Sequence, residues 1–213
     1  MRRFAVFAGE GHADAAAAEL RAAVFSPAAK EFSVSVLSIK LESDPILRRK
    51  CQPVKVIDRK IRRLLDDMLE TMYKAPGVGL AAPQVGINKR LIVVDVGEEG
   101  HGPWKLINPV IVSMSDEEEL GAEGCLSCPG IIGDVWRACE VTVRAIDVDG
   151  NLVDIQAKGF EARCFQHEID HLDGRLYIDA AENIRPAESE AENAESGAEA
   201  EIAPEAAAED AKE

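Results

Sequence analysis

Apolar residues recur at helical spacing between residues 58 and 74. The residues on one face of this segment are Ile61, Leu64, Leu65, Met68 and Met72. Asp58 precedes them and can cap a helix, because its carboxylate can accept hydrogen bonds from the first free backbone N–H groups. Ala75-Pro76-Gly77 should end the helix. The pattern therefore predicts an amphipathic helix over residues 58–74, followed by an extended loop over residues 77–84.

A second helical pattern covers residues 159–172. Four residues share one stripe, namely Phe160, Cys164, His167 and His171. Phe165, Ile169 and Leu172 extend the apolar surface beyond this stripe. A helix with so much apolar surface is mostly buried. Asp173-Gly174 supplies a glycine at the expected stop.

Strand patterns fill much of the chain between the two helices. Residues 90–96 and 105–114 are predicted strands, and residues 140–148 and 152–158 alternate around Asp149-Gly150-Asn151, which is a hairpin signal. The strands follow one another in succession, with one helix early and one late. This order predicts an α+β fold rather than a doubly wound α/β fold.

The two ends of the chain differ in composition from its middle. Residues 180–213 carry eleven acidic residues against Arg185 and Lys212, and so contribute −9 to the net charge of −15. This segment has no aromatic residue, and it cannot bury enough apolar surface to offset its ordering entropy. We predict a disordered acidic tail over residues 180–213, a single folded domain over residues 34–179, and an extension of unknown role over residues 1–33.

The amino-terminal extension does not resemble a targeting segment. Its apolar run after Arg2-Arg3 is about five residues long and ends at Glu10, which is too short for a secretory signal. No run approaches the roughly 18 apolar residues needed to span a membrane. The sequence therefore predicts a cytoplasmic protein that does not bind membranes.

Five cysteines are an odd number in an otherwise ordinary composition, which does not suggest a disulfide scaffold. Cys125 and Cys128 form a C-x-x-C pair, which could be half of a structural zinc site or a redox pair. A second C-x-x-C is absent from the sequence. We therefore predict that Cys128 is a small apolar residue of the loop.

The sequence His167-Glu168-Ile169-Asp170-His171 carries the strongest chemical signal. Histidines four residues apart stack on one face of a helix and can hold one metal ion. Glu168 lies close enough to take a proton from a water at that metal, as a general base does. A catalytic site of this kind uses three protein ligands. No histidine follows His171, so the best source of the third ligand is the cysteine-containing loop over residues 123–130.

Three motifs in the chain resemble those of the peptide deformylases, in the same order. They are residues 77–84 (GVGLAAPQ), residues 123–127 (EGCLS) and residues 166–171 (QHEIDH). The resemblance covers about residues 34–179. It implies β-sheets wrapped around a central metal-binding helix. It also implies hydrolysis of the N-formyl group from nascent polypeptides that begin with formyl-methionine.

The resemblance also implies roles for individual residues. Cys125, His167 and His171 would hold one divalent metal ion per chain. Fe2+ is the expected physiological ion, and Zn2+, Ni2+ or Co2+ are further options. Glu168 would be the general base, and the Gln84 side-chain amide and the Leu126 backbone N–H would stabilise the oxyanion. The positions that match the substrate site are Val78, Gly79 and Cys164.

Two other interpretations of the sequence remain open. The chain could be an H-E-x-x-H metalloprotease, or a catalytically silent member of the same fold. The expected partners are nascent formyl-methionyl polypeptides at the ribosome, acted on by a monomer without a nucleic-acid motif. Some members of the family are thought to contact the ribosome through a basic carboxy-terminal helix, and here that region is acidic. Two acids could be either exposed charges or partners within the site: Glu123, which could pair with Arg137, and Asp170.

Overall fold

The computed structural model describes residues 34–187, which form a mixed arrangement of helices and antiparallel sheets. The predicted extension over residues 1–33 and the chain beyond residue 187 lie outside the described residues. Two α-helices, α2 (Arg59–Lys74) and α3 (Gly159–Leu172), combine with eight strands in this part of the chain. The prediction of an α+β fold with one early and one late helix is confirmed.

The larger sheet has five strands in the order β1-β2-β3-β6-β7, and all neighbours are antiparallel. The strands are β1 (Gly79–Ala81), β2 (Leu91–Val94), β3 (Trp104–Met114), β6 (Glu140–Ile146) and β7 (Leu152–Lys158). The predicted hairpin is present, because Ile146 pairs with Leu152 across its turn. Gly150 has a φ of 93° in that turn, a conformation that favours glycine.

The smaller sheet has the order β4-β5-β8 and was not predicted. Its strands are β4 (Glu118–Cys125), β5 (Cys128–Ala138) and β8 (Glu182–Pro186). The loop expected over residues 123–130 is thus the closed end of a hairpin. The prediction of disorder from residue 180 is wrong for Glu182–Pro186, because this segment pairs with β5 and Arg185 forms an ion pair of 2.9 Å with Asp134.

Helix α2 forms where the pattern predicted it. The Asp58 side chain accepts a hydrogen bond of 2.9 Å from the backbone N–H of Ile61, and Ala75 follows the last helical residue. Leu65, Met68 and Met72 are fully buried. They belong to an apolar cluster that also contains Leu80 and Val93 of the larger sheet, so this helix covers one face of that sheet.

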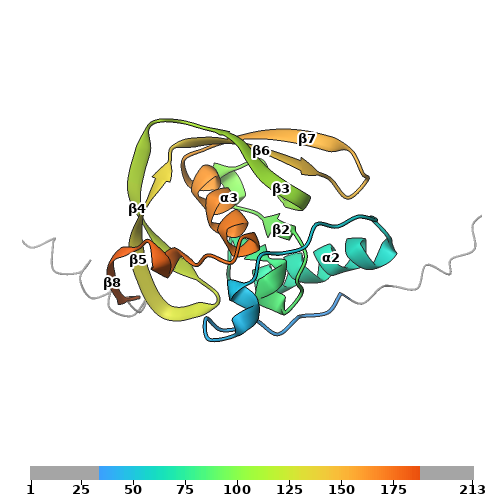
Figure 1. The fold of residues 1–213 in the computed structure, drawn as a ribbon, viewed down its shortest axis with the longest axis horizontal. Coiled ribbons are helices and arrows are strands. Elements are labelled where there is room, and N and C mark those ends of the chain that lie inside the picture. The colour runs from blue at the N-terminus through green and yellow to red at the C-terminus, as the bar shows by residue number, and fades with distance from the viewer. Residues whose placement is uncertain (1–33, 188–213) are drawn as a thin grey trace, which may run out of the picture. The chain divides into compact units, whose positions relative to one another are not determined.

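Helix α3 contacts strands of both sheets, and Figure 1 shows it lying between them. Phe165 and Leu172 are fully buried within a second apolar cluster, which includes Ile92 and Val143. The prediction that this helix is mostly buried is confirmed. Gly174, with a φ of 77°, follows the end of the helix as expected.

The segment predicted as an extended loop is more regular than expected. Residues 77–84 contain β1 and the start of the 3-10 helix η2 (Ala82–Val85). The strand predicted over residues 90–96 is shorter, because β2 covers only Leu91–Val94. Three further 3-10 helices, η1 (Pro45–Arg48), η3 (Gly97–Glu99) and η4 (Tyr177–Asp179), lie in connecting segments.

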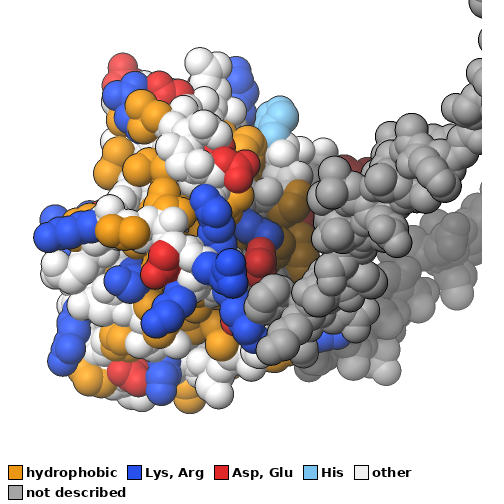
Figure 2. Space-filling view, turned by 90° about the vertical axis from the view of Figure 1, so that its right-hand side faces the viewer, with side chains coloured by type: hydrophobic (Ala, Val, Ile, Leu, Met, Phe, Trp, Pro, Cys, Tyr) orange, Lys and Arg blue, Asp and Glu red, His pale blue; other side chains and the backbone are white. Residues whose placement is uncertain are grey.

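Charge is unevenly distributed over the described surface. Residues 48–63 carry eight Lys and Arg residues, all exposed, against the single acid Asp58. Figure 2 shows the face seen from the side on which α2 begins, and there Lys and Arg outnumber Asp and Glu. Within residues 34–187, neither α-helix is both long enough and apolar enough to cross a membrane.

Candidate metal centre

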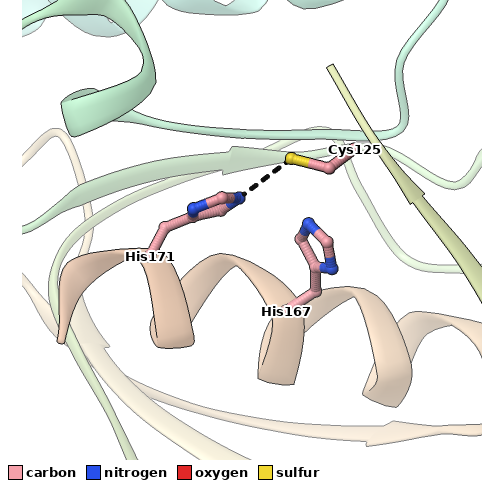
Figure 3. A group of neighbouring side chains, drawn as sticks. All are labelled: Cys125, His167 and His171. Atoms are coloured by element: carbon pink, nitrogen blue, oxygen red, sulfur yellow. Dashed lines mark hydrogen bonds between the residues drawn. The ribbon is translucent and has the colours of Figure 1, made fainter. Parts of the chain in front are cut away.

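One group of metal-ligating side chains stands out in the described part of the chain, and it consists of Cys125, His167 and His171. Each offers one ligand atom, and these atoms all lie within 4.8 Å of one another. Figure 3 shows both imidazoles projecting from α3 toward Cys125 at the end of β4, where Cys125 Sγ lies 3.3 Å from His171 Nε2. The helical spacing of the two histidines and the hairpin together bring three donors to one point.

The chemistry of these donors fits a divalent transition metal ion. Thiolate and imidazole suit Zn2+ and Fe2+, whereas Mg2+ and Ca2+ prefer oxygen ligands. Metal–ligand distances of about 2.0–2.3 Å allow one ion to reach donors with this separation. Burial lowers the pKa of His171 well below its ordinary value, with a further contribution from His167. A neutral imidazole at this position is the form that binds a metal.

A buried network fixes the orientation of His167. Glu123 Oε2 lies 2.9 Å from His167 Nδ1, which leaves Nε2 of this imidazole for a ligand. Glu123 also accepts hydrogen bonds from Arg137 Nε at 2.8 Å and from Arg163 Nη1 at 3.0 Å. Arg137 then donates a hydrogen bond of 2.6 Å to Asp170. Both acids are thus partners within the site and not isolated surface charges.

The protonation of this network follows from its contacts. Burial would raise the pKa of Glu123, but hydrogen bonds from His167 and Arg137 lower it to about 2. Burial would likewise lower the pKa of His167, yet the hydrogen bond to Glu123 outweighs that effect and raises it. Glu123 therefore stays ionised over the working range of an enzyme and presents a fixed negative charge behind His167.

Glu168 is buried beside the ligand group, with only 3% of its surface exposed. Its Oε2 has no hydrogen-bond partner within residues 34–187. Burial raises the pKa of Glu168 to about 7, although the nearby His167 opposes this shift. A carboxylate with a pKa near neutrality and an unused acceptor is suited to proton transfer.

Gln84 also contacts the ligand group, through the sulfur of Cys125. Its Oε1 accepts a hydrogen bond of 2.8 Å from the backbone N–H of Ala81, which determines the orientation of the amide. Its Nε2 consequently lies toward the hairpin, 3.4 Å from Cys125 Sγ and 3.2 Å from Ser127 Oγ. The Gln84 amide is fully buried, so it is a fixed donor beside the ligands.

A cavity of about 500 Å³ opens onto this group. The predicted site residues along its wall are Val78, Gly79, Gln84, Cys125, Leu126, Cys164, His167 and Glu168. His171 is buried behind them, with 1% of its surface exposed. The structure therefore brings all nine residues predicted from the sequence to one place.

The wall of this cavity has no room for a side chain at Gly79. A Cβ atom added there would lie 2.8 Å from Glu168 Cδ and 2.9 Å from Cys164 Sγ. The absence of a side chain at this strand position leaves room for the Glu168 carboxyl. This close approach, and not backbone conformation, requires the glycine.

Arg163 is a residue of the site that was not predicted from the sequence. This residue lies one turn before His167 on a mostly buried helix, and its side chain is 11% exposed. It donates hydrogen bonds to Glu123 and to the backbone carbonyl of Val135, which lies on β5. A charged residue four positions from a candidate ligand, on a helix with so much apolar surface, is a signal that could have identified it.

Comparisons with known proteins agree with this geometry. A family model described as polypeptide deformylase matches residues 36–187. A peptide deformylase of Symbiobacterium thermophilum is 53% identical over 178 residues, which cover 84% of this chain and 82% of the relative. A peptide deformylase of Halothermothrix orenii is 54% identical over 149 residues, covering 70% of this chain and 96% of the relative.

Solved structures give the same result. A peptide deformylase from Synechococcus elongatus in complex with actinonin is 46% identical with a TM-score of 0.66, covering 69% of this chain and 81% of that one. The peptide deformylase from Thermotoga maritima is 41% identical with a TM-score of 0.66, covering 69% of this chain and 98% of that one. The family model, the relatives and the solved structures thus all point to the same family.

Proposed function

The chain belongs to the polypeptide deformylase family, whose metal-dependent members remove formyl groups from polypeptides. On that premise we propose that Cys125, His167 and His171 are its metal ligands and that Glu168 is its general base. The observation that carries this proposal is the convergence of three donor atoms within 4.8 Å, beside a buried carboxylate with a free acceptor. Helix α3 is then the metal-binding helix of the fold.

The metal supplies Lewis-acid chemistry: a bound divalent ion lowers the pKa of a water molecule and polarises a carbonyl oxygen. A side chain of the protein, and not the metal, transfers the proton of the attacking water. Glu168 accepts the proton that water loses as its oxygen attacks the formyl carbon. Glu168 then gives that proton to the peptide nitrogen as the carbon–nitrogen bond breaks. Formate and a free amino terminus leave.

The negative charge on the formyl oxygen requires hydrogen-bond donors. We assign this role to Nε2 of Gln84 and to the backbone N–H of Leu126. The support for Gln84 is the hydrogen bond from Ala81, which holds its amide in one orientation. Loss of one such donor typically raises the barrier by about 3–4 kcal/mol.

The cavity wall supports a substrate site for the methionyl end of the polypeptide. Val78 is 40% exposed and belongs to the wall, as do Gly79 and Cys164. The Cys164 thiol donates a hydrogen bond to the Val78 carbonyl at 3.6 Å, which joins α3 to the strand that starts at Gly79. We assign these three residues to substrate binding.

We assign Fe2+ as the physiological ion, with Zn2+, Ni2+ and Co2+ able to occupy the same ligands. A Cys-His-His set accepts all four ions, so affinity alone does not choose among them. Metal analysis of protein purified without oxygen, paired with turnover by each reconstituted form, identifies the active ion.

We further propose that the protein acts as a monomer in the cytoplasm, on nascent chains at the ribosome. The exposed cations of residues 48–63 support this, since Lys and Arg clusters attract the phosphates of RNA. The acidic segment beyond residue 187 would instead be repelled by RNA. The contact is therefore expected through the basic face of Figure 2.

The proposed reaction is tested with two substrates given to the same preparation. A formyl-methionyl dipeptide should release formate, and a longer unformylated peptide should stay intact. Cleavage of the longer peptide without formate release would select the metalloprotease. Failure with both substrates, in protein loaded with metal, would select a catalytically silent member of the fold.

The ligand assignment is tested by a matched pair of cysteine variants. Cys125→Ala should lose most of its metal, because a soft anionic donor is removed. Cys128→Ala should keep one metal ion per chain, because its sulfur does not belong to the ligand group. Retention of metal by Cys125→Ala together with loss by Cys128→Ala would reverse the assignment.

A further inference from the structure

The hairpin that supplies the metal ligand also places a second thiol opposite it. Cys125 ends β4 and Cys128 begins β5, and the two are Cα partners in the register of these strands. Directly opposed residues of an antiparallel pair have Cα atoms about 4.5–5.5 Å apart. A disulfide needs about 4.4–6.8 Å. The register shifts between Gly124 and Cys125, and the pairing of Cys125 with Cys128 then closes the hairpin, so a separation of about this size is expected between their Cα atoms.

The two side chains also lie in the same surroundings. Cys128 belongs to an apolar cluster with Leu47 and Tyr177, and Cys125 packs against that same cluster. All five cysteines of the chain are free thiols. Cys128 is outside the metal-ligand group, although it is the pairing partner of Cys125 in the hairpin. The C-x-x-C pair thus contains one thiol that the proposed catalytic role uses and one that it does not.

Both thiols are within reach of small molecules. Cys125 and Cys128 line the cavity of about 500 Å³, and Cys125 is partly exposed, whereas Cys128 is 2% exposed. An oxidant that enters the cavity would therefore meet Cys125 first. Cys128 is the more buried of the two in the wall of the same cavity, and as the pairing partner of Cys125 it can act as the resolving thiol.

We propose that Cys125 and Cys128 form a reversible disulfide, and that metal binding and this disulfide exclude each other. The exclusion rests on the proposed role of Cys125 as a ligand. A sulfur bonded to another sulfur is no longer a thiolate, so the donor set would fall from three to two. A bound ion, in turn, occupies the lone pair with which Cys125 would attack.

The reaction is balanced with a small disulfide, such as oxidised glutathione, as the oxidant. The Cys125 sulfur attacks one sulfur of glutathione disulfide, so a mixed disulfide forms and one glutathione leaves. The Cys128 sulfur then attacks the Cys125 sulfur, and the second glutathione leaves. The two cysteines are oxidised by two electrons, and one oxidised glutathione becomes two reduced glutathiones. Excess thiol reverses both steps.

The test uses the full chain in two forms, zinc-loaded and metal-free after chelation. Each is treated with oxidised glutathione, and free thiols are counted. The metal-free form should lose two of its five thiols. The tryptic peptide over residues 106–137 contains both cysteines and should become lighter by two hydrogen atoms. The zinc-loaded form should keep all five thiols, and reduction of the metal-free form should restore its zinc binding.

Variants separate this disulfide from oxidation elsewhere. Cys128→Ala and Cys128→Ser should each take up one glutathione at Cys125 without losing two hydrogens. The matched control Cys139→Ser should still form the disulfide, because Cys139 is not one of the two proposed thiols. Its substitution also leaves the mass of the peptide over residues 106–137 unchanged. Oxidation confined to other cysteines, or a stable mixed disulfide in the unmodified chain, would overturn the proposal.

Failure of the inference differs from failure of the proposed ligand set. If zinc protects the chain but metal-free protein forms no Cys125–Cys128 bond, the disulfide is refuted and the ligand role stands. If the bond forms equally fast with zinc present and Cys125→Ala still binds zinc, the ligand role and the mutual exclusion both fail.

Discussion

A single methyl group added at Gly79 should disable catalysis without removing the metal. In Gly79→Ala the new Cβ would lie 2.8 Å from Glu168 Cδ. Carbon atoms pack at about 3.5–4.0 Å, so the carboxyl group must move by roughly 1 Å. Displacement of a catalytic group by about 1 Å can cost about 10²-fold in rate. We therefore expect kcat to fall about 100-fold, which corresponds to about 2.7 kcal/mol in the barrier.

The same chain offers a matched control. In Gly124→Ala, next to the proposed ligand Cys125, the new Cβ has its nearest neighbour at 3.6 Å, which is ordinary contact. Neither glycine has a positive φ, so both changes stabilise the chain equally through the unfolded state, by about 0.4–1 kcal/mol. Gly124→Ala should therefore keep its turnover and melt at a slightly higher temperature than the unmodified chain. Gly79→Ala should lose about 1–3 kcal/mol from overpacking.

The assay is release of formate from a formyl-methionyl dipeptide, with zinc content and melting temperature measured on each variant. Gly79→Ala should bind one metal ion per chain, because the three atoms nearest to the new Cβ belong to Glu168 and Cys164 and not to a proposed ligand. In a Glu168→Gln background, Gly79→Ala should cost little more, since both changes impair the same group. Full turnover by Gly79→Ala, or additive losses in the double variant, would refute the reasoning.

Three other predictions concern the surroundings of the ligands. Glu168→Gln should keep one metal ion per chain while kcat falls about 10² to 10⁴-fold. His171→Ala, in contrast, should lose the metal. A metal-free Glu168→Gln protein would make Glu168 a ligand. Glu123→Gln should weaken zinc affinity about 10–100-fold. Glu119→Gln, a change at an exposed position of the same strand, should leave zinc affinity unchanged. Equal zinc affinities of the two variants would show that Glu123 does not support His167. Truncation after residue 187 should leave the melting temperature unchanged. Removal of residues 182–187 as well should lower it, because β8 is lost from β5.

The parts of the fold that the sequence predicted are those specified by local pattern. Helix α2 has a cap and an apolar face, and the hairpin of β6 and β7 has a turn with a glycine at a positive φ. The two histidines share a face because four residues make about one helical turn. These features depend on neighbours in the sequence, so they can be recognised without the structure.

The parts that were missed depend on contacts between distant segments. Strand β4 is mostly exposed and rich in acids, so it lacks the alternation of a half-buried strand. Strand β8 is exposed along its whole length and is stabilised by pairing with β5 and by the Arg185–Asp134 ion pair. Its composition resembled the acidic segment that follows. Only the partner strand distinguishes the two.

The hairpin of β4 and β5 determines the site in two ways at once. Glu123 and Cys125 are two residues apart on one strand, so both side chains can lie on the face that meets α3. Cys125 supplies the sulfur beside His171, and Glu123 holds the ring of His167. A slip of the strand by one residue would turn both away from the helix. Arg137, which is on β5, and Arg163, which is on α3, both bind Glu123, so they tie the hairpin to α3 and oppose that slip. The buried ion pairs therefore specify the register on which the three proposed ligands depend.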